Sequence, residues 1–280
     1  MTPLNILYQK SEVNYYRLGY GRKPAFCFHG YGESASSFSF LETHAGQYYT
    51  LYVIDLPFHG LTEWKDGLNF TVEDLRKIVK EILDKHNPEI KKTDEEINQQ
   101  GLTLIGFSLG ARICLSLYET MPQQIEKMIL LGPDGLKVNF WYWLSTQTRM
   151  GNKFFSYTMQ HPQWFFGFLK ALNKLSLINT SIFKFVKIYI EDCEVRQLLY
   201  LRWTCLRKVK PAIRKIKRLV NKNKTAVRLI YGKHDRMMLV KRGEKFKNGI
   251  EDHCKITVIN SGHQVLHEKH VNQILPSLLH

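Results

Sequence analysis

The sequence predicts an α/β fold in which a mostly parallel, twisted sheet carries helices on both faces and is interrupted by one helical insertion. Three observations support this. Short apolar runs bounded by turn residues alternate with longer segments of helical period, which is typical of a parallel sheet covered by helices. The alternation stops in one long stretch, 134–225, that has helical periodicity and no convincing strand. One apolar run leads directly into Gly106-Phe107-Ser108-Leu109-Gly110 and then into helix-forming residues.

The strands are expected in chain order from these apolar runs. The runs at 6–8 and 13–18 predict an antiparallel edge pair. The parallel strands are predicted at 25–28, 51–54, 102–105, 128–131, 227–231 and 256–259. Helices are predicted at 72–85, with Thr71 as its N-cap, at 109–119 and at 267–279.

The break in alternation predicts the domain organisation. Residues 1–133 and 226–280 are expected to form the α/β core, and 134–225 an inserted helical cap. The second half of the insertion is strongly basic and contributes much of the formal net charge of +15. No acid interrupts its last cations, which are Arg202, Arg207, Lys208, Lys210, Arg214, Lys215, Lys217, Arg218, Lys222 and Lys224.

Composition and targeting signals limit the function classes. With 280 residues, 44% of them hydrophobic and 23% charged, the chain has the composition of a globular protein rather than a disordered one. The first residues do not read as a secretory signal, and basic residues interrupt the aromatic-rich stretch 140–190 before it could span a bilayer. Five scattered cysteines without metal-ligand spacing predict reduced, mostly buried thiols. We therefore expect a cytoplasmic protein without a transmembrane segment.

Gly106-Phe107-Ser108-Leu109-Gly110 is the G-x-S-x-G pattern of a nucleophile elbow. The two glycines allow a strand to turn sharply into a helix, which exposes the serine hydroxyl in a strained conformation. A serine hydroxyl is a weak nucleophile at neutral pH and needs a histidine base, an orienting carboxylate and donors for the oxyanion. The pattern therefore predicts where further residues should be found.

The best candidate for the base is His263. It lies in Asn260-Ser261-Gly262-His263, directly after the last predicted strand and before the final helix. A short loop at that point holds an imidazole over the carboxyl edge of the sheet. Other histidines nearby fall before a strand or within the helix and fit less well.

Two residues are candidates for the carboxylate. Asp235 follows the strand at 227–231 and gives the chain order Ser, Asp, His. Asp134 ends the preceding strand and could also reach the histidine. We favour Asp235, because Pro133 and Gly135 on either side explain Asp134 as a turn residue.

The oxyanion hole is predicted at the backbone N–H groups of Tyr31 and Leu109. Phe28-His29-Gly30-Tyr31-Gly32 places glycines directly after an early strand, so that the Tyr31 N–H can point into the site. The elbow supplies the second donor from Leu109.

Together these motifs resemble the α/β-hydrolase superfamily over nearly the whole chain. The resemblance extends to Asp55-Leu56-Pro57-Phe58-His59-Gly60, which is similar to the family's D-x-P-G-H-G loop with Phe58 where glycine is usual. This exchange suggests a bulkier wall of the site or a shifted loop. The resemblance implies catalysis by Ser108, His263 and Asp235 through an acyl-enzyme, without metal or organic cofactor, beneath a cap. Serine at the nucleophile position argues against the aspartate-dependent dehalogenases and epoxide hydrolases of the superfamily.

The substrate is less constrained. The resemblance implies that cap aromatics, among them Trp141 and Trp164, line the pocket, although core packing of the cap explains any one of them equally well. Arg112 is either a solvent-facing helix residue or a cation for an anionic substrate, and it resembles the arginine of the family's menaquinone-pathway synthases. The basic stretch is either a solvated helix or a site that attracts an acidic partner or a phospholipid surface.

These inferences predict a serine hydrolase that cleaves a small-molecule carboxylic ester or thioester. The alternative within the fold is a carbon–carbon bond hydrolase or a menaquinone-pathway-like lyase with the same triad. Outside the fold's chemistry, the net charge suggests a nucleic-acid- or membrane-surface-binding protein, which we do not favour because the predicted triad is intact. Neither the oligomeric state nor the acyl length follows from the sequence.

Overall fold

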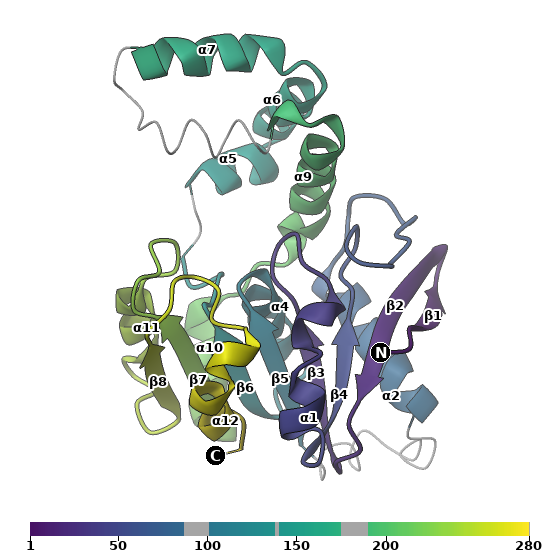
Figure 1. The fold of residues 1–280 in the computed structure, drawn as a ribbon, viewed down its shortest axis with the longest axis vertical. Coiled ribbons are helices and arrows are strands. Elements are labelled where there is room, and N and C mark those ends of the chain that lie inside the picture. The colour runs from purple at the N-terminus through teal and green to yellow at the C-terminus, as the bar shows by residue number, and fades with distance from the viewer. Residues whose placement is uncertain (87–100, 138–139, 175–189, 280) are drawn as a thin grey trace. The chain divides into compact units, whose positions relative to one another are not determined.

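The structure, a computed structural model, describes residues 1–86, 101–137, 140–174 and 190–279 (Figure 1). Contacts divide the chain into two compact units. The first unit, here called the core unit, comprises Met1–Asp66, Phe70–Lys137 and Lys208–His280. The second, the helical unit, comprises Gly67–Asn69 and Val138–Arg207.

The core unit is built on an eight-stranded sheet with the order β1-β2-β4-β3-β5-β6-β7-β8. The strands β1 and β2 pair antiparallel, as do β2 and β4, and all later neighbours are parallel. The fold is therefore the predicted mostly parallel sheet with an antiparallel edge pair. Its strands are β1 (Leu4–Tyr8), β2 (Ser11–Leu18), β3 (Lys23–Phe28), β4 (Tyr49–Ile54), β5 (Leu102–Phe107), β6 (Ile125–Leu131), β7 (Ala226–Gly232) and β8 (Cys254–Ile259).

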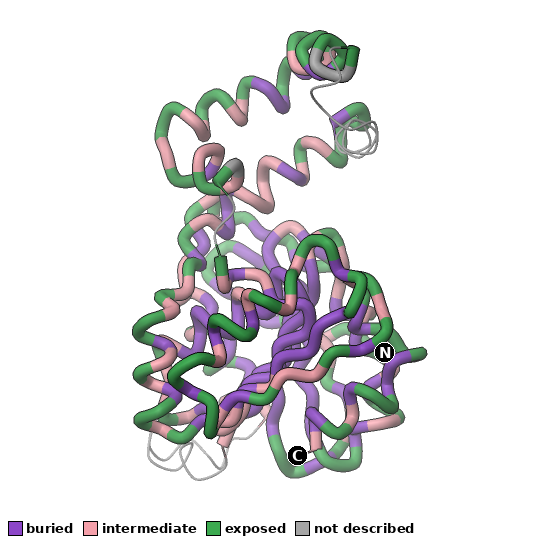
Figure 2. The backbone as a smooth tube through the Cα atoms, turned by 90° about the vertical axis from the view of Figure 1, so that its left-hand side faces the viewer, coloured by how far each residue is buried: buried purple, intermediate pink, exposed green. Residues whose placement is uncertain are grey.

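Helices cover both faces of this sheet (Figure 1). Helices α1 (Leu41–Ala45) and α12 (Val271–Leu279) lie on one face and pack against each other. Helices α2 (Val72–His86), α4 (Leu109–Tyr118) and α10 (Ile213–Asn223) lie on the other. The central strands β4 and β5 are buried at every position, which gives the continuous buried band in Figure 2. Burial on both faces explains why these strands read as apolar runs rather than alternating patterns.

Local signals in the sequence account for several element ends. The Thr71 hydroxyl accepts a hydrogen bond from the Asp74 N–H at 3.2 Å, and the Asp74 carboxylate accepts one from the Thr71 N–H at 2.7 Å. This reciprocal arrangement caps the N-terminus of α2. The final helix begins at Val271, later than predicted, because Glu268–His270 forms a separate 3-10 turn. Helix α11 (Val240–Lys247) was not among the predicted elements.

The helical unit consists of α5 (Phe140–Gln147), α6 (Arg149–Gln160), α7 (Gln163–Lys174) and α9 (Cys193–Cys205) among the described residues. Side-chain caps start two of these helices. Thr148 accepts from the Gly151 N–H, and Asp192 accepts from the N–H groups of Glu194 and Val195. Aromatic rings join the helices, as in the pair Phe155–Trp203 with centroids 5.6 Å apart.

The boundary between the units differs from the predicted one. The helical unit ends at Arg207, whereas the predicted insertion extended to residue 225. Helix α10 belongs to the core unit because Ile216 and Val220 are fully buried there. Thr225, two residues after the helix, also joins the core, since its hydroxyl bonds to the Tyr118 hydroxyl at 2.8 Å. Helical periodicity identifies a helix with one apolar side, but it does not show which unit covers that side.

Candidate active site

Ser108 lies at the sharp turn between β5 and α4. Its backbone has φ 49° and ψ −111°, a conformation that residues other than glycine adopt at a cost of about 1–3 kcal/mol. The turn is held from the neighbouring strand, because the Ser108 N–H donates to the Leu131 carbonyl at 2.9 Å. Its side chain is almost entirely buried, with 8% of the residue exposed. The predicted elbow is thus present in its strained form.

The two glycines of the elbow are required by close backbone contacts. A Cβ atom on Gly106 would lie 2.4 Å from the Gly110 carbonyl oxygen. A Cβ atom on Gly110 would lie 1.8 Å from the Phe28 carbonyl oxygen of β3. Both distances are shorter than any real carbon–oxygen contact, so the strand, the helix and the adjacent strand meet this closely only with glycine at both positions.

Ser108, His263 and Asp235 form a continuous chain of hydrogen bonds. His263 Nε2 lies 3.0 Å from Ser108 Oγ, and His263 Nδ1 lies 2.7 Å from Asp235 Oδ2. Asp235 follows β7 and His263 follows β8, so three parallel strands deliver the three side chains to the same edge of the sheet. The geometry is that of a Ser-His-Asp triad.

The Asp235 side chain is fully buried and fixed by backbone donors. Its Oδ1 accepts hydrogen bonds from the N–H groups of Met237 and Met238, at 2.7 and 2.9 Å. Its Oδ2 is left for His263. A buried carboxylate needs several hydrogen-bond donors. Asp235 has three, which are the Met237 N–H, the Met238 N–H and His263 Nδ1.

His263 lies between an aromatic ring and a glycine. The Phe107 ring is tilted against the imidazole with centroids 5.3 Å apart. On the neighbouring strand end, a Cβ atom added to Gly132 would lie 3.2 Å from His263 Cε1, and Gly132 itself has φ 50°. Because Gly132 has no side chain, it can adopt the left-handed turn after β6 and leaves space for the His263 imidazole.

Asp134, the alternative carboxylate, has different partners. Its Oδ2 lies 3.5 Å from Arg112 Nε, and its N–H donates to the Ser108 carbonyl at 3.2 Å. Arg112 is 12% exposed at its side chain and is thus neither solvent-facing nor open as a simple anion site. The pair ties the loop after β6 to helix α4, and Asp235, not Asp134, is the carboxylate bonded to His263.

The predicted oxyanion donors lie at the start of α4 and in the loop after β3. Leu109 is the first residue of α4, so its N–H has no acceptor one turn earlier in the helix. Tyr31 lies in the loop after β3, and its ring packs edge-on against His59 at a centroid distance of 6.0 Å. This loop is braced by Glu33, whose carboxylate accepts from the Gly30 N–H at 3.1 Å and from the Gln264 side-chain amide at 3.0 Å.

Sequence reasoning missed Glu33 as a functional residue. Its two bonds connect the loop that carries Tyr31 with the residue next to His263. The only signal in the sequence is a carboxylate three residues after the first glycine of the loop, a spacing that suits many turns. The connection to Gln264 depends on the sheet order and could not be read from the chain.

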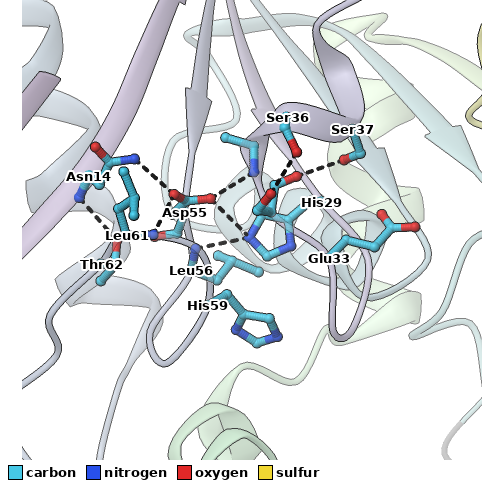
Figure 3. A network of polar contacts seen from close by, with 12 residues as sticks. Asn14, His29, Glu33, Ser36, Ser37, Asp55, Leu56, His59, Leu61 and Thr62 are labelled. Atoms are coloured by element: carbon cyan, nitrogen blue, oxygen red, sulfur yellow. Dashed lines mark hydrogen bonds and ion pairs between the residues drawn. The ribbon is translucent and has the colours of Figure 1, made fainter. Parts of the chain in front are cut away.

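A buried polar network next to the loop after β3 centres on Asp55 (Figure 3). Its carboxylate accepts from the Ala35 N–H, the Asn14 side-chain amide and the Leu61 N–H, at 2.7, 2.8 and 3.0 Å. Next to it, His29 Nε2 accepts from the Leu56 N–H at 3.1 Å, so the proton is on Nδ1 and is donated to the Gly30 carbonyl at 2.8 Å.

Phe58, at the glycine position of the D-x-P-G-H-G loop, adopts the left-handed conformation that glycine would favour, with φ 62°. A non-glycine residue in this conformation costs about 1–2 kcal/mol of backbone strain. Phe58 is half-buried, which agrees with a bulkier side chain at this position.

Two further predicted residues belong to the helical unit. Trp164 on α7 is 37% exposed and contacts the rings of Phe154 and Phe165. Trp141 falls within α5, and its side chain lies outside the described residues. Packing within the helical unit accounts for the observed contacts of Trp164.

Cys27 and Cys114 are free thiols that are fully buried in the core unit. Burial raises the pKa of the Cys27 and Cys114 thiols, so neither supplies a thiolate at neutral pH. Within the described ranges, no group of three or more His, Cys, Asp or Glu side chains is arranged to hold a metal ion. In the same part of the chain, no helix is both long and apolar enough to cross a membrane.

Comparison with known families identifies the chain's relatives. The model of the serine aminopeptidase family S33 matches residues 22–270. The chain belongs to this family of α/β-hydrolases. The match includes the loop that carries Tyr31, Ser108 and the loop that carries His263. The resemblance predicted from the motifs is thereby confirmed.

Similar proteins agree with this S33-family assignment. A segment of 115 residues is 30% identical to the uncharacterized hydrolase YugF of Bacillus subtilis (strain 168), covering 41% of this chain and 38% of that protein. The structure is similar to a carboxylesterase of the thaumarchaeon Nitrososphaera gargenis, with a TM-score of 0.65, 16% identity and coverage of 99% and 97% of the two chains. It is also similar to the thioesterase domain of the curacin biosynthetic pathway, with a TM-score of 0.60, 14% identity and 99% coverage of both chains. At these identities the structural likenesses establish the fold.

Proposed function

We propose that this S33-family hydrolase cleaves a small-molecule carboxylic ester or thioester through an acyl-enzyme on Ser108. The observation that carries the proposal is the unbroken hydrogen-bond chain Ser108–His263–Asp235, with distances of 3.0 and 2.7 Å. Each member is held by its own support: the elbow strain, the Gly132 and Phe107 neighbours, and the Met237 and Met238 N–H groups.

The reaction follows from these positions. Ser108 Oγ attacks the carbonyl carbon while His263 Nε2 takes the hydroxyl proton, and Asp235 stabilises the imidazolium through Nδ1–H. The tetrahedral oxyanion accepts hydrogen bonds from the Leu109 and Tyr31 N–H groups. Collapse breaks the bond to the alcohol or thiol, which leaves with the proton from His263. Water, deprotonated by His263, then attacks the acyl-enzyme and releases the acid and Ser108.

We further propose that the reaction takes place in the cytoplasm. All five cysteines are free, four of them buried, which is compatible with a reducing compartment. Asp134 largely neutralises the charge of Arg112. This pairing favours a substrate that does not need an anionic group for recognition.

The first test is labelling with a fluorophosphonate, which reacts with activated serines. Wild type should label, and Ser108→Ala should not, with unchanged circular dichroism. The matched control is Ser116→Ala, which removes a buried hydroxyl from the same helix and should retain full labelling. Failure of folded wild type to label, or labelling that persists in Ser108→Ala, would contradict the proposal.

The second test is a substrate panel on wild type and Ser108→Ala. It contains p-nitrophenyl esters of increasing acyl length, acyl thioesters, a vinylogous diketone and an aminoacyl naphthylamide. Turnover of esters or thioesters above the others supports the proposal. Turnover of the diketone alone assigns carbon–carbon bond hydrolysis, and turnover of the naphthylamide alone assigns the aminopeptidase activity that the family description names.

A further inference from the structure

Helix α10 carries a mainly cationic surface on its solvent side. Its buried residues are Ile216 and Val220. The side chains on its opposite side are cationic except for Asn221, and no acid occurs in the helix. Those that are exposed are Arg214, Lys215, Arg218, Lys222 and, at the C-cap, Lys224.

The spacing of these cations is unfavourable for the helix itself. Arg214, Arg218 and Lys222 follow one another at intervals of four residues, so they lie above each other on one side of the helix. Like charges at this spacing weaken a helix, whereas a solvated helix normally interleaves acids with bases. Packing of Ile216 and Val220 would be the same with acids at these positions. The stability of the fold therefore gives no reason for the pattern.

Helix α11 extends the cationic surface beside α10. Lys217 Nζ donates to the carbonyls of Lys245 and Asn248, at 3.1 and 2.6 Å, and Asn221 donates to the Gly249 carbonyl at 2.8 Å. These bonds tie α10 to the C-terminal end of α11 and to the turn that follows it. Lys241 and Lys245 on α11 are exposed. We call the exposed cations of both helices the α10–α11 basic face: Arg214, Lys215, Arg218, Lys222, Lys224, Lys241 and Lys245.

Few acids neutralise this face. Lys215 lies 3.5 Å from Glu119, and Glu244 is the acid on α11 itself. Glu251 and Asp252 lie in the turn beyond α11, where Glu251 accepts from the Gly249 N–H at 2.7 Å. The counter-charge must therefore come from another molecule or from salt.

Exposed apolar side chains lie where α11 begins. Met237 and Leu239 are 55% and 45% exposed, and Leu239 is the N-cap residue of α11. Cations combined with exposed apolar side chains suit the surface of a lipid bilayer, which offers anionic headgroups next to an apolar layer. Nucleic acid fits less well, since Phe246, the one aromatic residue on these two described helices, is buried and cannot stack on a base.

We propose that the α10–α11 basic face, with Met237 and Leu239 at its border, docks this protein onto an anionic phospholipid bilayer. The contact is peripheral and electrostatic, with two apolar side chains entering the headgroup layer. The same loop contributes the Met237 and Met238 N–H groups that hold Asp235. Docking therefore brings the lipid surface to the loop that supports the triad carboxylate. Binding itself needs no catalysis, so it is independent of the proposed hydrolysis.

The test is co-sedimentation of the full chain with vesicles. Binding to phosphatidylcholine vesicles with about a third phosphatidylserine should exceed binding to pure phosphatidylcholine vesicles, and should fall at high salt. The variant Arg214→Gln/Arg218→Gln/Lys222→Gln should bind about a hundredfold more weakly, because each cation near an anionic surface contributes a factor of about five. Met237→Ser/Leu239→Ser should weaken binding without changing its salt dependence.

Two controls separate this proposal from general charge effects. Arg22→Gln/Lys77→Gln/Lys80→Gln removes the same charge from exposed positions outside the basic face and should bind as wild type. Ser108→Ala should also bind as wild type, which keeps the outcome apart from that of the activity tests. Equal loss in both triple variants, equal binding to the two vesicle types, or tighter binding to an RNA duplex than to anionic vesicles would each overturn the proposal.

Discussion

Replacing Asp235 with asparagine should abolish most activity while preserving the fold, because the structure gives its two oxygens separate tasks. Oδ1 accepts from the Met237 and Met238 N–H groups, and Oδ2 accepts from His263 Nδ1. In Asp235→Asn the amide oxygen can still serve the two backbone donors, which turns the NH2 group toward His263. Nδ1 must then accept a hydrogen bond, so the imidazole proton moves to Nε2.

The change of His263 tautomer affects its contact with Ser108. With its proton on Nε2, His263 donates to Ser108 Oγ across the 3.0 Å contact and cannot accept the hydroxyl proton. The same exchange in a Ser-His-Asp protease lowers kcat by about 10⁴-fold. We expect a loss of this size, or about 5.5 kcal/mol of transition-state stabilisation, with a KM within about threefold of wild type because no substrate contact changes.

The assay is kcat and KM on the best ester of the panel, with urea unfolding to confirm a native fold. Asp134→Asn is the matched control, since it removes a charge one strand away that pairs with Arg112 rather than with His263. It should keep kcat within about tenfold of wild type. A large loss in Asp134→Asn together with a small loss in Asp235→Asn would refute the assignment of the triad acid.

Three other exchanges test the supports of the site. Gly132→Ala should lower kcat by about tenfold, because a Cβ atom 3.2 Å from the His263 ring shifts the base slightly from its position. Glu33→Ala should lower kcat about tenfold at nearly constant KM, because the Gly30 N–H and the loop it belongs to lose their anchor, and Glu33→Gln should recover part of the loss. Asp55→Asn should lower the free energy of unfolding in urea by about 3 kcal/mol, since three donors converge on a carboxylate that is 1% exposed.

Each of these expectations has a result that contradicts it. Unchanged kcat in Gly132→Ala would mean that His263 has room that the structure does not give it. A rise in KM at constant kcat in Glu33→Ala would make Glu33 a substrate-binding residue rather than a positioning one. Wild-type stability of Asp55→Asn would mean that the network around Asp55 does not contribute to folding.

The sheet and the elbow could be predicted because both depend on local sequence. The central strands β4 and β5 are buried on both faces, so each appears as an apolar run. The G-x-S-x-G pattern satisfies steric limits at Gly106 and Gly110 that no other residue meets. The chain order Ser, Asp, His then predicted which strand ends carry the partners. Proximity of these ends follows from parallel strands sharing one carboxyl edge.

The features that could not be predicted depend on contacts between distant segments. Glu33 bonds to Gln264 because β3 and β8 end at the same edge of the sheet, and Asp55 gathers donors from Asn14, Ala35 and Leu61. The same limit applies to the boundary of the helical unit. The periodicity of α10 gave the correct helix, but only the burial of Ile216 against the core shows to which unit it belongs.

Backbone strain separates functional turns from ordinary ones in this chain. Among the described residues, four that are not glycine have positive φ: Gln9, Phe58, Ser108 and Lys224. Gln9 turns the β1–β2 hairpin and Lys224 ends α10 as a left-handed cap, so both occupy positions where secondary structure requires this conformation. Phe58 and Ser108 instead follow β4 and β5 at the carboxyl edge of the sheet. In the described chain, backbone strain that no hairpin or helix end explains thus occurs only at the edge where His263 and Asp235 converge. At this edge a rigid scaffold must hold the nucleophile in a conformation that it would otherwise leave.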